Sequence, residues 1–532
     1  MKTTTKTPLF GAFRKALTLA LAANKTETTA QEVVERAEAA ALTRRQFIEN
    51  MGKTVLLTGF SGLITEGVSQ PFNPSIFSKK QPRIAIIGAG LAGLNALHTF
   101  KKAGFDATIY EASGRTSGRI LSVQNAMGEG TWTEFGGEFI DTNHTDMWDL
   151  VKEFGLELMD LGQPSETALT KEIYFFEGKN YTLAQVVDAF RGFADKIKAD
   201  VDRLPDELSY KTTDPFARQI DQMSISEYLE KVGATGWIKT FIETAYESEY
   251  GMSPQEQSAI NLIGYISTNT EGGKFELYGD SDERYKVKGG NQRIPEALAQ
   301  KYVHHIEVYR SLESIKRTST HYNLTFSGLK NAVKADFVLI AMPFTRLRNV
   351  DIRLEMPQVK WDAINNLGYG TNAKLMLGMT KHFWRAQGNQ GLCFSDVGVP
   401  NGWDNAQLQT KDDETAGLSI LIGGAAGLAV GNGTPQMQKD IYLPRWEKVF
   451  KGATEHFNGK VARMHWASHP YALGSYTSYK KGQYTSIAEA EVLPIGRVFF
   501  AGEHCGGIFS GYMNGAAKSG REAAEAILAA SR

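Results

Sequence analysis

The segment from Arg83 to Glu111 constrains the fold most, because a glycine-rich turn there joins two apolar runs through a helical pattern. Arg83–Ile87 is short, apolar and rich in isoleucine, which predicts a buried strand. The residues after the turn keep helical spacing until Gly104, which predicts the end of a helix. Asp106–Tyr110 predicts a second strand. The order strand, turn, helix, strand is typical of a parallel α/β unit.

The turn itself has the composition of a dinucleotide-binding turn. It contains Gly88, Ala89, Gly90 and Gly93. In such turns the first glycine allows a tight bend, the second lets the backbone approach a pyrophosphate, and the third packs helix on strand. The helix N-terminus offers N–H groups and a positive dipole end to phosphate. Glu111 follows where a carboxylate accepts hydrogen bonds from ribose hydroxyls. A lone glycine pattern can be a plain turn, but the flanking strands and the acid favour nucleotide binding.

Composition narrows the classes of function. The chain has 532 residues, 42% of them hydrophobic, and a net charge of -1, which predicts two or three domains with a sizeable core. No basic stripe with interleaved aromatic residues is present, so nucleic acid is not an expected partner. Cys393 and Cys505 form neither a CxxC pair nor a disulfide framework. The histidines show no HExxH spacing and no GxSxG occurs, so we expect no metal and no serine hydrolase site.

The sequence of the N-terminal region predicts a leader and not a part of the hydrophobic core. Residues 1–42 predict a helical leader, and residues 43–81 predict a twin-arginine signal and linker. The signal is Thr43–Ile48, T-R-R-Q-F-I, followed by a moderately apolar run. That run is shorter than the ~20 residues of a membrane span, so no integral membrane span is expected. We expect export by the twin-arginine route, to the periplasm or outside the cell; the alternative is an ordinary N-terminal helix of a cytoplasmic protein.

The rest of the chain leaves the nucleotide-binding unit and returns to it. From Leu150 to about Glu276 the pattern is mostly helical, which predicts an insertion that walls a substrate cavity. Strands are predicted at Ile306–Tyr309, Ile315–Arg317, Tyr322–Phe326, Phe337–Ala341, Leu418–Gly427, Val461–Trp466 and Arg497–Ala501. Asp396–Thr415 is polar and predicts a loop, and a helix is predicted from Gly511 to Ala530. The order of these segments therefore predicts one cofactor domain whose sequence is interrupted by a second domain.

Taken together, these segments resemble the flavin-containing amine oxidases, which include monoamine, polyamine and L-amino-acid oxidases. The shared motifs are GAGLAG, E-A-x-x-R-x-x-G-R, E-F-G-G, the Ala-Lys strand, G-S-Y-T, and A-G-E with G-Y-M-N-G-A. They run from about Arg83 to Ile527. The resemblance implies an α/β fold with a Rossmann-like, GR2-type FAD-binding domain and an interleaved α+β substrate domain. The implied FAD-binding domain takes residues 82–165, 280–345 and 463–532, and the substrate domain takes residues 166–279 and 346–462.

The resemblance also implies which residues hold FAD. Gly88, Gly90 and Gly93 would hold the pyrophosphate, Glu111 the ribose, and Arg115 and Arg119 the phosphates. The Leu312 backbone would contact adenine, Gly136 and Gly137 would lie along the isoalloxazine, Glu503 would bind the ribityl or phosphate side, and the Met513 N–H would meet the pyrimidine oxygen. Ala89, Ala112, Gly118 and Gly502 belong to the same motifs and are predicted to line the cofactor. Ser117 departs from the family by replacing a glycine.

The implied catalytic residues are one lysine and two tyrosines. Lys374 matches the family lysine that holds a water against flavin N5, although a lysine on a strand more often points to solvent. Tyr476 and Tyr512 match the two rings that sandwich the amine over the flavin, and Trp466 is expected beside the substrate. Ser475 stands where monoamine oxidases carry the cysteine that bonds to flavin, so the FAD is expected to be non-covalent.

The substrate pocket departs from that of the venom-type L-amino-acid oxidases. Phe139 occupies the place of the arginine that grips the substrate carboxylate in those enzymes. Glu138 and Asp141 lie on either side of Phe139 and indicate a pocket that tolerates a cation. The alternative for both acids is a hydrogen-bonded loop or a contact on the ribose side.

The resemblance predicts an FAD-dependent oxidase of amines. Hydride would pass from the C–N carbon to the flavin, giving an imine that hydrolyses to a carbonyl compound and ammonia, and oxygen would then be reduced to hydrogen peroxide. A primary amine or diamine is the expected substrate, with an L-amino acid as the alternative. A flavin-dependent dehydrogenase or desaturase with a protein electron acceptor and a non-catalytic FAD-binding subunit are further alternatives. A homodimer is compatible with this reading.

Overall fold

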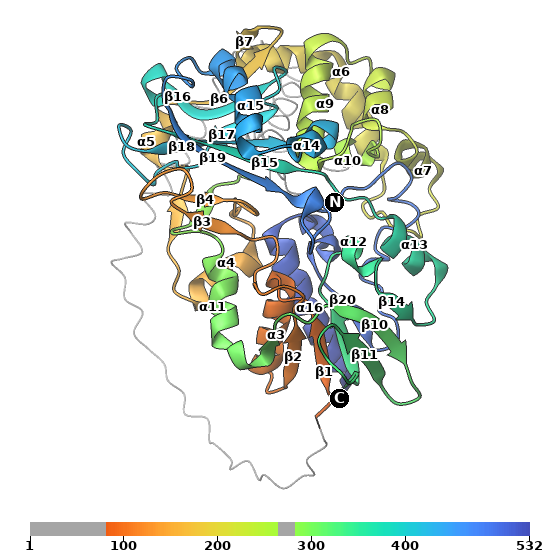
Figure 1. Ribbon diagram of the computed structural model, residues 1–532. Coiled ribbons are helices and arrows are strands. Elements are labelled where there is room, and N and C mark those ends of the chain that lie inside the picture. Colours follow the sequence, from red (N-terminus) through yellow and green to blue (C-terminus); the bar gives the residue numbers. More distant parts are fainter. Residues whose placement is uncertain (1–80, 264–281, 532) are drawn as a thin grey trace, which may run out of the picture.

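The structure is a computed structural model that describes residues 81–263 and 282–531 (Figure 1). The predicted leader at 1–42 and the predicted signal and linker at 43–81 lie outside the described residues, apart from Gln81. The described chain is built on two main sheets, one parallel and one mostly antiparallel, as the α/β expectation requires.

A five-stranded parallel sheet contains the first strand and its glycine turn. Its strands in spatial order are β20 (Val498–Phe500), β13 (Phe337–Ile340), β1 (Ile84–Ile87), β2 (Ala107–Tyr110) and β9 (Ile306–Glu307). Ile84 and Ile86 of β1 face a core shared with helices, whereas Ala85 and Ile87 face a second core on the other side. The sheet is therefore buried on both faces, which explains why its strands read as continuous apolar runs.

The first face of the parallel sheet is covered by helices. They are α3 (Leu91–Lys102), α4 (Thr145–Glu153), α11 (Arg293–Lys301) and α16 (Met513–Ser531). The first and last of these touch closely, because a Cβ at Gly520 would lie 2.1 Å from the carbonyl oxygen of Ala92. The C-terminal helix therefore packs beside the helix that follows the glycine turn, although the two are far apart in sequence (Figure 1).

The second face packs against a smaller four-stranded sheet and two helices. These are β12 (Val333–Ala335), β11 (Tyr322–Phe326), β10 (Leu312–Arg317), β14 (Asp351–Arg353), α12 (Phe344–Leu347) and α13 (Gln358–Asn366). Two short antiparallel pairs lie outside the main sheets: β3 (Ser122–Gln124) with β4 (Trp132–Glu134), and β5 (Leu158–Asp160) with β8 (Tyr285–Val287). The second pair joins the chain on either side of the helical insertion.

A seven-stranded sheet forms the other half of the molecule. Its strands in spatial order are β19 (Phe457–His465), β15 (Ala373–Met379), β18 (Ala416–Ile422), β17 (Asn401–Asp404), β16 (Asn389–Ser395), β6 (Thr170–Phe176) and β7 (Lys179–Tyr181). All pairings are antiparallel except that of β16 with β6. The pattern in β15 is that of a strand buried on both faces: Ala373, Leu375 and Leu377 enter one core, and Lys374 points the other way.

Helices cover both faces of the seven-stranded sheet. On one side lie α6 (Leu183–Arg203), α7 (Pro215–Asp221), α8 (Ile225–Val232), α9 (Gly236–Tyr250) and α10 (Ile260–Ile263). On the other lies α15 (Pro435–Val449), preceded by α14 (Gly424–Val430), while α5 (Pro164–Thr167) precedes β6. The helical wall predicted for the insertion is present in its described part, and capping boxes at Thr182 and Ser224 start α6 and α8.

Four strands of this sheet, β6, β7, β16 and β17, fall where the sequence predicts none. β6 and β7 lie in the stretch predicted to be mostly helical, and β17 lies in the stretch predicted to be a loop. β6 pairs with β16, which is distant in sequence, so tertiary contacts override the local pattern there, whereas β7 and β17 pair with strands close to them in the chain. The domain division stays a prediction. β14 is a strand of the four-stranded sheet and α13 packs in the same core, although both fall in the interval assigned to the substrate domain.

Candidate active site

A cavity of ≈ 670 Å³ lies where the parallel sheet meets the seven-stranded sheet. Segments of both sheets line it, from the end of β1 to β15, β17 and β18. The predicted residues that line it are Gly88, Gly90, Glu111, Ala112, Arg115, Gly118, Arg119, Gly136, Gly137, Glu138, Leu312, Lys374, Trp466, Tyr476, Gly502, Glu503, Tyr512 and Met513. Ala89, Gly93 and Asp141 are not among the lining residues. The cavity therefore brings together most of the predicted site from segments spread over the chain.

The glycine turn is shaped by close backbone contacts. Gly88 has a φ of +107°, and a Cβ there would lie 2.7 Å from the carbonyl oxygen of Ala341. A Cβ at Gly93 would lie 2.0 Å from the carbonyl oxygen of Gly88, so this glycine lets α3 pack on the turn. Gly90 is the N-cap of α3 and brings no side chain of its own to the first turn. First-turn N–H groups beside an open cavity fit an anionic group such as a pyrophosphate.

Glu111 is fixed at the end of β2 by the turn itself. Its Oε2 accepts a hydrogen bond from the N–H of Ala89 at 2.7 Å, and its Oε1 accepts from the N–H and the hydroxyl of Ser113 at 2.8 and 2.7 Å. A carboxylate has about four acceptor positions, two on each oxygen, so Oε2, which accepts one of these hydrogen bonds, retains capacity for another donor. This geometry fits a group that accepts hydrogen bonds from a sugar hydroxyl.

Arg115, one of the two predicted phosphate arginines, also holds its own loop together. Arg115 donates to the carbonyl oxygens of Thr116 and Gly118 at 3.0 and 2.5 Å and to the Ser117 hydroxyl at 2.6 Å. Ser117 has a φ of +77°, a conformation that favours glycine, which explains why a glycine suits this position. Its hydroxyl donates to the Ile120 carbonyl oxygen at 2.9 Å. The serine is thus tied into the loop rather than left strained.

Glu503 fastens several segments at the rim of the cavity. Its carboxylate accepts from Arg119 Nη1 at 3.0 Å and from the backbone N–H of Gly511 at 2.9 Å. Arg119 also donates to the carbonyl oxygen of Ser475 at 2.6 Å. Burial raises the pKa of the Glu503 carboxyl, but the Arg119 charge, together with His504 and the hydrogen bonds from Thr477 and Arg119, leaves that pKa below its usual value. Beside any cofactor contact, Glu503 thus joins the loop after β2 to the segment before α16.

The glycine pair after β4 allows two tight approaches. A Cβ at Gly136 would lie 1.8 Å from the carbonyl oxygen of Arg119, and one at Gly137 would lie 2.7 Å from Cγ of Met513. Met513 opens α16, so a second helix N-terminus faces the same cavity. Two helix starts, a ribose-type carboxylate and bare glycine backbone fit a dinucleotide that ends in a flat ring.

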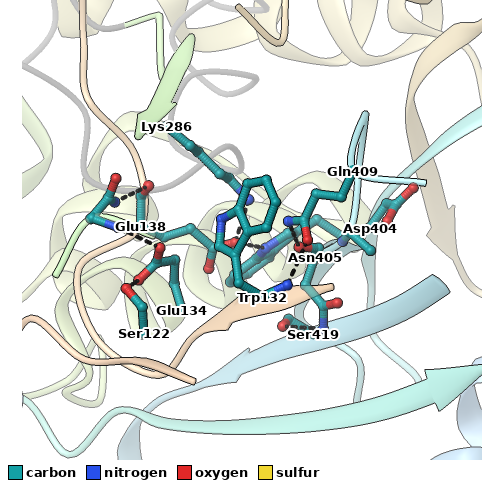
Figure 2. A network of polar contacts seen from close by, with 12 residues as sticks. Ser122, Trp132, Glu134, Glu138, Lys286, Asp404, Asn405, Gln409 and Ser419 are labelled. Carbon is teal, nitrogen blue, oxygen red and sulfur yellow. Dashed lines mark hydrogen bonds and ion pairs between the residues drawn. The ribbon is translucent and has the colours of Figure 1, made fainter. Parts of the chain in front are cut away.

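Lys374 lies at the centre of a buried polar cluster. Its Nζ donates to the carbonyl oxygens of Glu134 and Gly136 at 3.1 and 2.9 Å and to Oε2 of Glu138 at 2.6 Å. The other oxygen of Glu138 accepts from Lys286 Nζ at 2.6 Å and from Trp403 Nε1 at 2.9 Å. Figure 2 shows Lys286 and Glu138 reaching toward each other.

The charge of Glu138 is therefore balanced inside the protein. Burial alone would raise the pKa of its carboxyl, but Lys286 and Lys374 together lower it to about 2. The sequence indicates that Glu138 is an acid open to a substrate cation. In the structure, each of its two oxygens already accepts a hydrogen bond from a lysine. Lys286 and Trp403 have no counterpart among the predicted site residues, and the short sequences of β8 (Y-K-V) and β17 (N-G-W-D) give no signal that would find them.

The aromatic residues predicted around the substrate line one region of the cavity. Tyr476 donates its hydroxyl to the carbonyl oxygen of Glu249 at 2.6 Å. Tyr512 lies edge-on to His144, with 5.1 Å between the ring centroids. Trp466 Nε1 donates to the carbonyl oxygen of Phe135 at 3.2 Å. These contacts hold the three rings in place, and all three residues line the cavity.

The acid that lines this aromatic region is Glu283 rather than Asp141. Asp141 is fully buried, accepts from the N–H of Glu283 at 2.9 Å, and lies 3.4 Å from His144 Nε2. Glu283 lines the cavity, and its Oε1 has no hydrogen-bond partner among the described residues. Burial, followed by the charges of Asp141 and Glu249, raises the pKa of the Glu283 carboxyl well above its usual value.

Neither cysteine of the chain lines the cavity. Cys393 is buried in β16, and Cys505 is buried with its Sγ 3.5 Å from the carbonyl oxygen of Glu491. Ser475, which stands at the position predicted from the family to carry a flavin-linked cysteine, donates its hydroxyl to Oδ1 of Asn372 at 2.6 Å. A thioether to a flavin ring would need a cysteine at the cavity wall.

Residues 81–263 and 282–531 contain neither a cluster of metal ligands nor a helix that could span a membrane. No group of three or more His, Cys, Asp or Glu side chains there is arranged to hold a metal ion. Within the same ranges, none of the helices has both the length and the apolar character that a membrane span needs.

A family comparison covers most of the chain. Residues 91–528 match the sequence model of the flavin containing amine oxidoreductases. Among curated proteins, a flavin-containing amine oxidase of Danio rerio is 22% identical over 463 residues, covering 84% of this chain and 86% of that protein. An L-amino-acid oxidase of Sistrurus catenatus edwardsii is 23% identical over 509 residues, covering 89% of this chain and 90% of that protein.

Solved structures share the fold. Cyclohexylamine oxidase from Brevibacterium oxydans superposes with a TM-score of 0.74 at 21% identity, over 85% of this chain and 99% of that one. A putrescine oxidase with putrescine bound superposes with a TM-score of 0.71 at 19% identity, over 84% and 99% of the two chains.

Proposed function

Because the chain belongs to the flavin-containing amine oxidoreductase family, we propose that it oxidises a primary amine with FAD and passes the electrons to oxygen. The observation that carries this proposal is one continuous cavity that joins the glycine turn to Lys374 and the aromatic residues. When bound, FAD supplies the hydride acceptor. The protein supplies binding, orientation and charge.

Binding, orientation and charge come from different residues along the cavity. The first turn of α3 and Glu111 hold the pyrophosphate and ribose at one end. At the other, Tyr476, Tyr512 and Trp466 exclude water and orient the C–N bond of a neutral amine. A neutral nitrogen keeps the lone pair that assists hydride loss. Lys374 places a positive charge where negative charge develops during oxygen reduction.

We propose that the FAD is not covalently bound, and the burial of both cysteines away from the cavity supports this. Acid precipitation of the purified yellow protein is expected to release FAD into the supernatant. The supernatant is measured by its absorbance and by chromatography against FAD and FMN. Flavin that stays in the protein pellet would contradict non-covalent binding, and released FMN would contradict FAD.

We also propose that the substrate carries a second amino group, which binds as a cation while the reacting nitrogen is neutral. The arginines lining the cavity are Arg115, Arg119, Arg310 and Arg346, and all stand on segments outside the seven-stranded sheet. Phe139, Glu283 and Trp403 line the aromatic region, so it offers an acid and no arginine for a carboxylate. An ammonium group beside Glu283 would stabilise its ionised form, which burial otherwise disfavours.

Substitution of Glu283 tests this substrate class. Glu283→Gln is expected to raise KM for diamines about tenfold, as expected for a lost hydrogen bond to a charged group, and to leave KM for monoamines unchanged. The measurement is peroxide release under air from monoamines, diamines and L-amino acids. Glu313→Gln, at the opposite end of the same cavity, is the matched control and should change neither.

The other outcomes select the alternatives. Peroxide from L-amino acids alone would assign an L-amino-acid oxidase. Flavin bleaching by amines under nitrogen without peroxide in air would assign a dehydrogenase. We retain twin-arginine export as a proposal from the Thr43–Ile48 motif.

A further inference from the structure

A second buried lysine lies across Glu138 from Lys374. The two oxygens of Glu138 face different partners: Oε2 accepts from Lys374 and Oε1 accepts from Lys286, each at 2.6 Å. The side chains of Lys286, Glu138 and Lys374 are 2%, 3% and 8% exposed. We call these three residues the lysine–glutamate–lysine cluster; Figure 2 shows its Lys286–Glu138 half.

The cluster holds an odd number of charges. Lys374 and Glu138 alone would form a neutral pair with little field beyond it. Lys286 adds a second cation, so the three groups together carry one net positive charge. We propose that Lys286 is a positioning residue that acts through Glu138 to leave a net positive charge on the cavity wall beside the flavin. This rests on the proposed function, because it assigns that wall to the flavin ring.

Burial makes this charge effective. Little water reaches any of the three side chains, so their field is screened less than that of a surface pair. Trp403 gives Glu138 a further hydrogen bond at 2.9 Å, and its ring centroid lies 5.3 Å from Lys374 Nζ. Lys286 Nζ lies 4.8 Å from the ring centroid of Phe139. The cations are thus held by aromatic rings, one carboxylate and, for Lys374, two backbone carbonyl oxygens rather than by solvent.

The charge bears on the oxygen half of the reaction. Oxygen takes two electrons and two protons to become hydrogen peroxide while the reduced flavin returns to its oxidised form. Negative charge builds on oxygen before the protons arrive, and a nearby positive charge stabilises it. The same charge favours the reduced, anionic flavin and raises its midpoint potential.

Variants that change the net charge of the lysine–glutamate–lysine cluster test the proposal. Lys286→Met leaves the cluster neutral without touching Lys374, and the pair of Lys374 with Glu138 keeps both charges satisfied. The double variant Lys286→Met with Glu138→Gln removes one charge of each sign and restores the net positive charge through Lys374 alone. A role in packing alone would make the double variant worse than the single one, whereas the electrostatic role makes it better.

The expected result is a loss in the single variant and its recovery in the double variant. Lys286→Met is expected to lower the midpoint potential of the bound flavin and to slow its reoxidation by oxygen about tenfold. The double variant is expected to recover both to within about threefold of the wild-type rate constant. A Lys286→Met protein with wild-type potential and rate, or a double variant no better than the single one, would overturn the proposal.

The choice of pH, of a control variant and of the reductant separates the effect of the cluster from other effects. Measurements are made at pH 6, where the Glu134 carboxyl, whose pKa burial raises to about 7, is mostly uncharged. Lys288→Met removes an exposed lysine two residues along the chain and should change neither quantity. The flavin is reduced with dithionite, so the result does not depend on an amine substrate. A colourless wild-type protein would instead show that the proposed function fails.

Discussion

Lys374→Met is expected to slow reoxidation of the flavin by oxygen about 100-fold, the usual scale for losing one preorganised electrostatic contact to a developing anion. The reason is the position of Nζ, which is buried at the cavity wall and donates to the carbonyl oxygen of Gly136 at 2.9 Å. Flavin reduction by the amine should change less, because hydride transfer to the flavin does not build an anion on oxygen. Without Lys374, Glu138 keeps Lys286 and Trp403 as partners, so the fold should survive.

Stopped-flow double mixing separates the two half-reactions. The protein is first reduced by amine under nitrogen and then mixed with oxygen, and each step is followed by flavin absorbance. Lys381→Met, an exposed lysine just beyond β15, is the matched control. A Lys374→Met protein that is reduced slowly but reoxidised at the wild-type rate would remove the proposed role of this lysine.

Gly93→Ala is expected to abolish flavin retention and to destabilise the protein by about 3 kcal/mol, the upper range for an overpacked site. The new Cβ would lie 2.0 Å from the carbonyl oxygen of Gly88 and 3.2 Å from Cγ2 of Ile86. Neither neighbour is a flexible side-chain end, so α3 must move away from the turn. That movement withdraws the first-turn N–H groups from the pyrophosphate.

The measurement is the flavin-to-protein absorbance ratio together with the thermal midpoint. Gly192→Ala is the matched control, because Gly192 lies within α6 with no atom within 4 Å of a Cβ. That change should stabilise the protein by up to about 1 kcal/mol. A Gly93→Ala protein that keeps one flavin per chain and melts with the wild type would contradict the packing described here.

The cofactor half of the molecule could be predicted because its signals are local. β1, the turn, α3 and β2 follow one another within Arg83–Glu111, and each step has its own residue types. The orientation of Lys374 could be predicted for the same reason, since alternation along one strand decides which face a side chain joins.

The substrate half could be predicted only in part, because its contacts are distant in sequence. β6 pairs with β16, more than 200 residues further along the chain, and no local pattern indicates that pairing. The sequence indicates that Glu138 is available to a substrate, because it does not show that Lys286 and Trp403, distant in sequence, donate hydrogen bonds to it. Glu283 was missed because its role depends on the cavity and on Asp141 and Glu249 around it, not on its neighbours in sequence.

We propose that this cavity holds a flavin that an amine reduces and oxygen reoxidises. To test this, the purified protein is mixed under nitrogen with one equivalent per flavin of the amine that gives most peroxide, and one pulse of oxygen is then added. We expect the flavin absorbance to bleach completely, to return after the pulse, and to be accompanied by one hydrogen peroxide per flavin. Flavin that no amine bleaches, or purified protein that takes up no flavin, would contradict it.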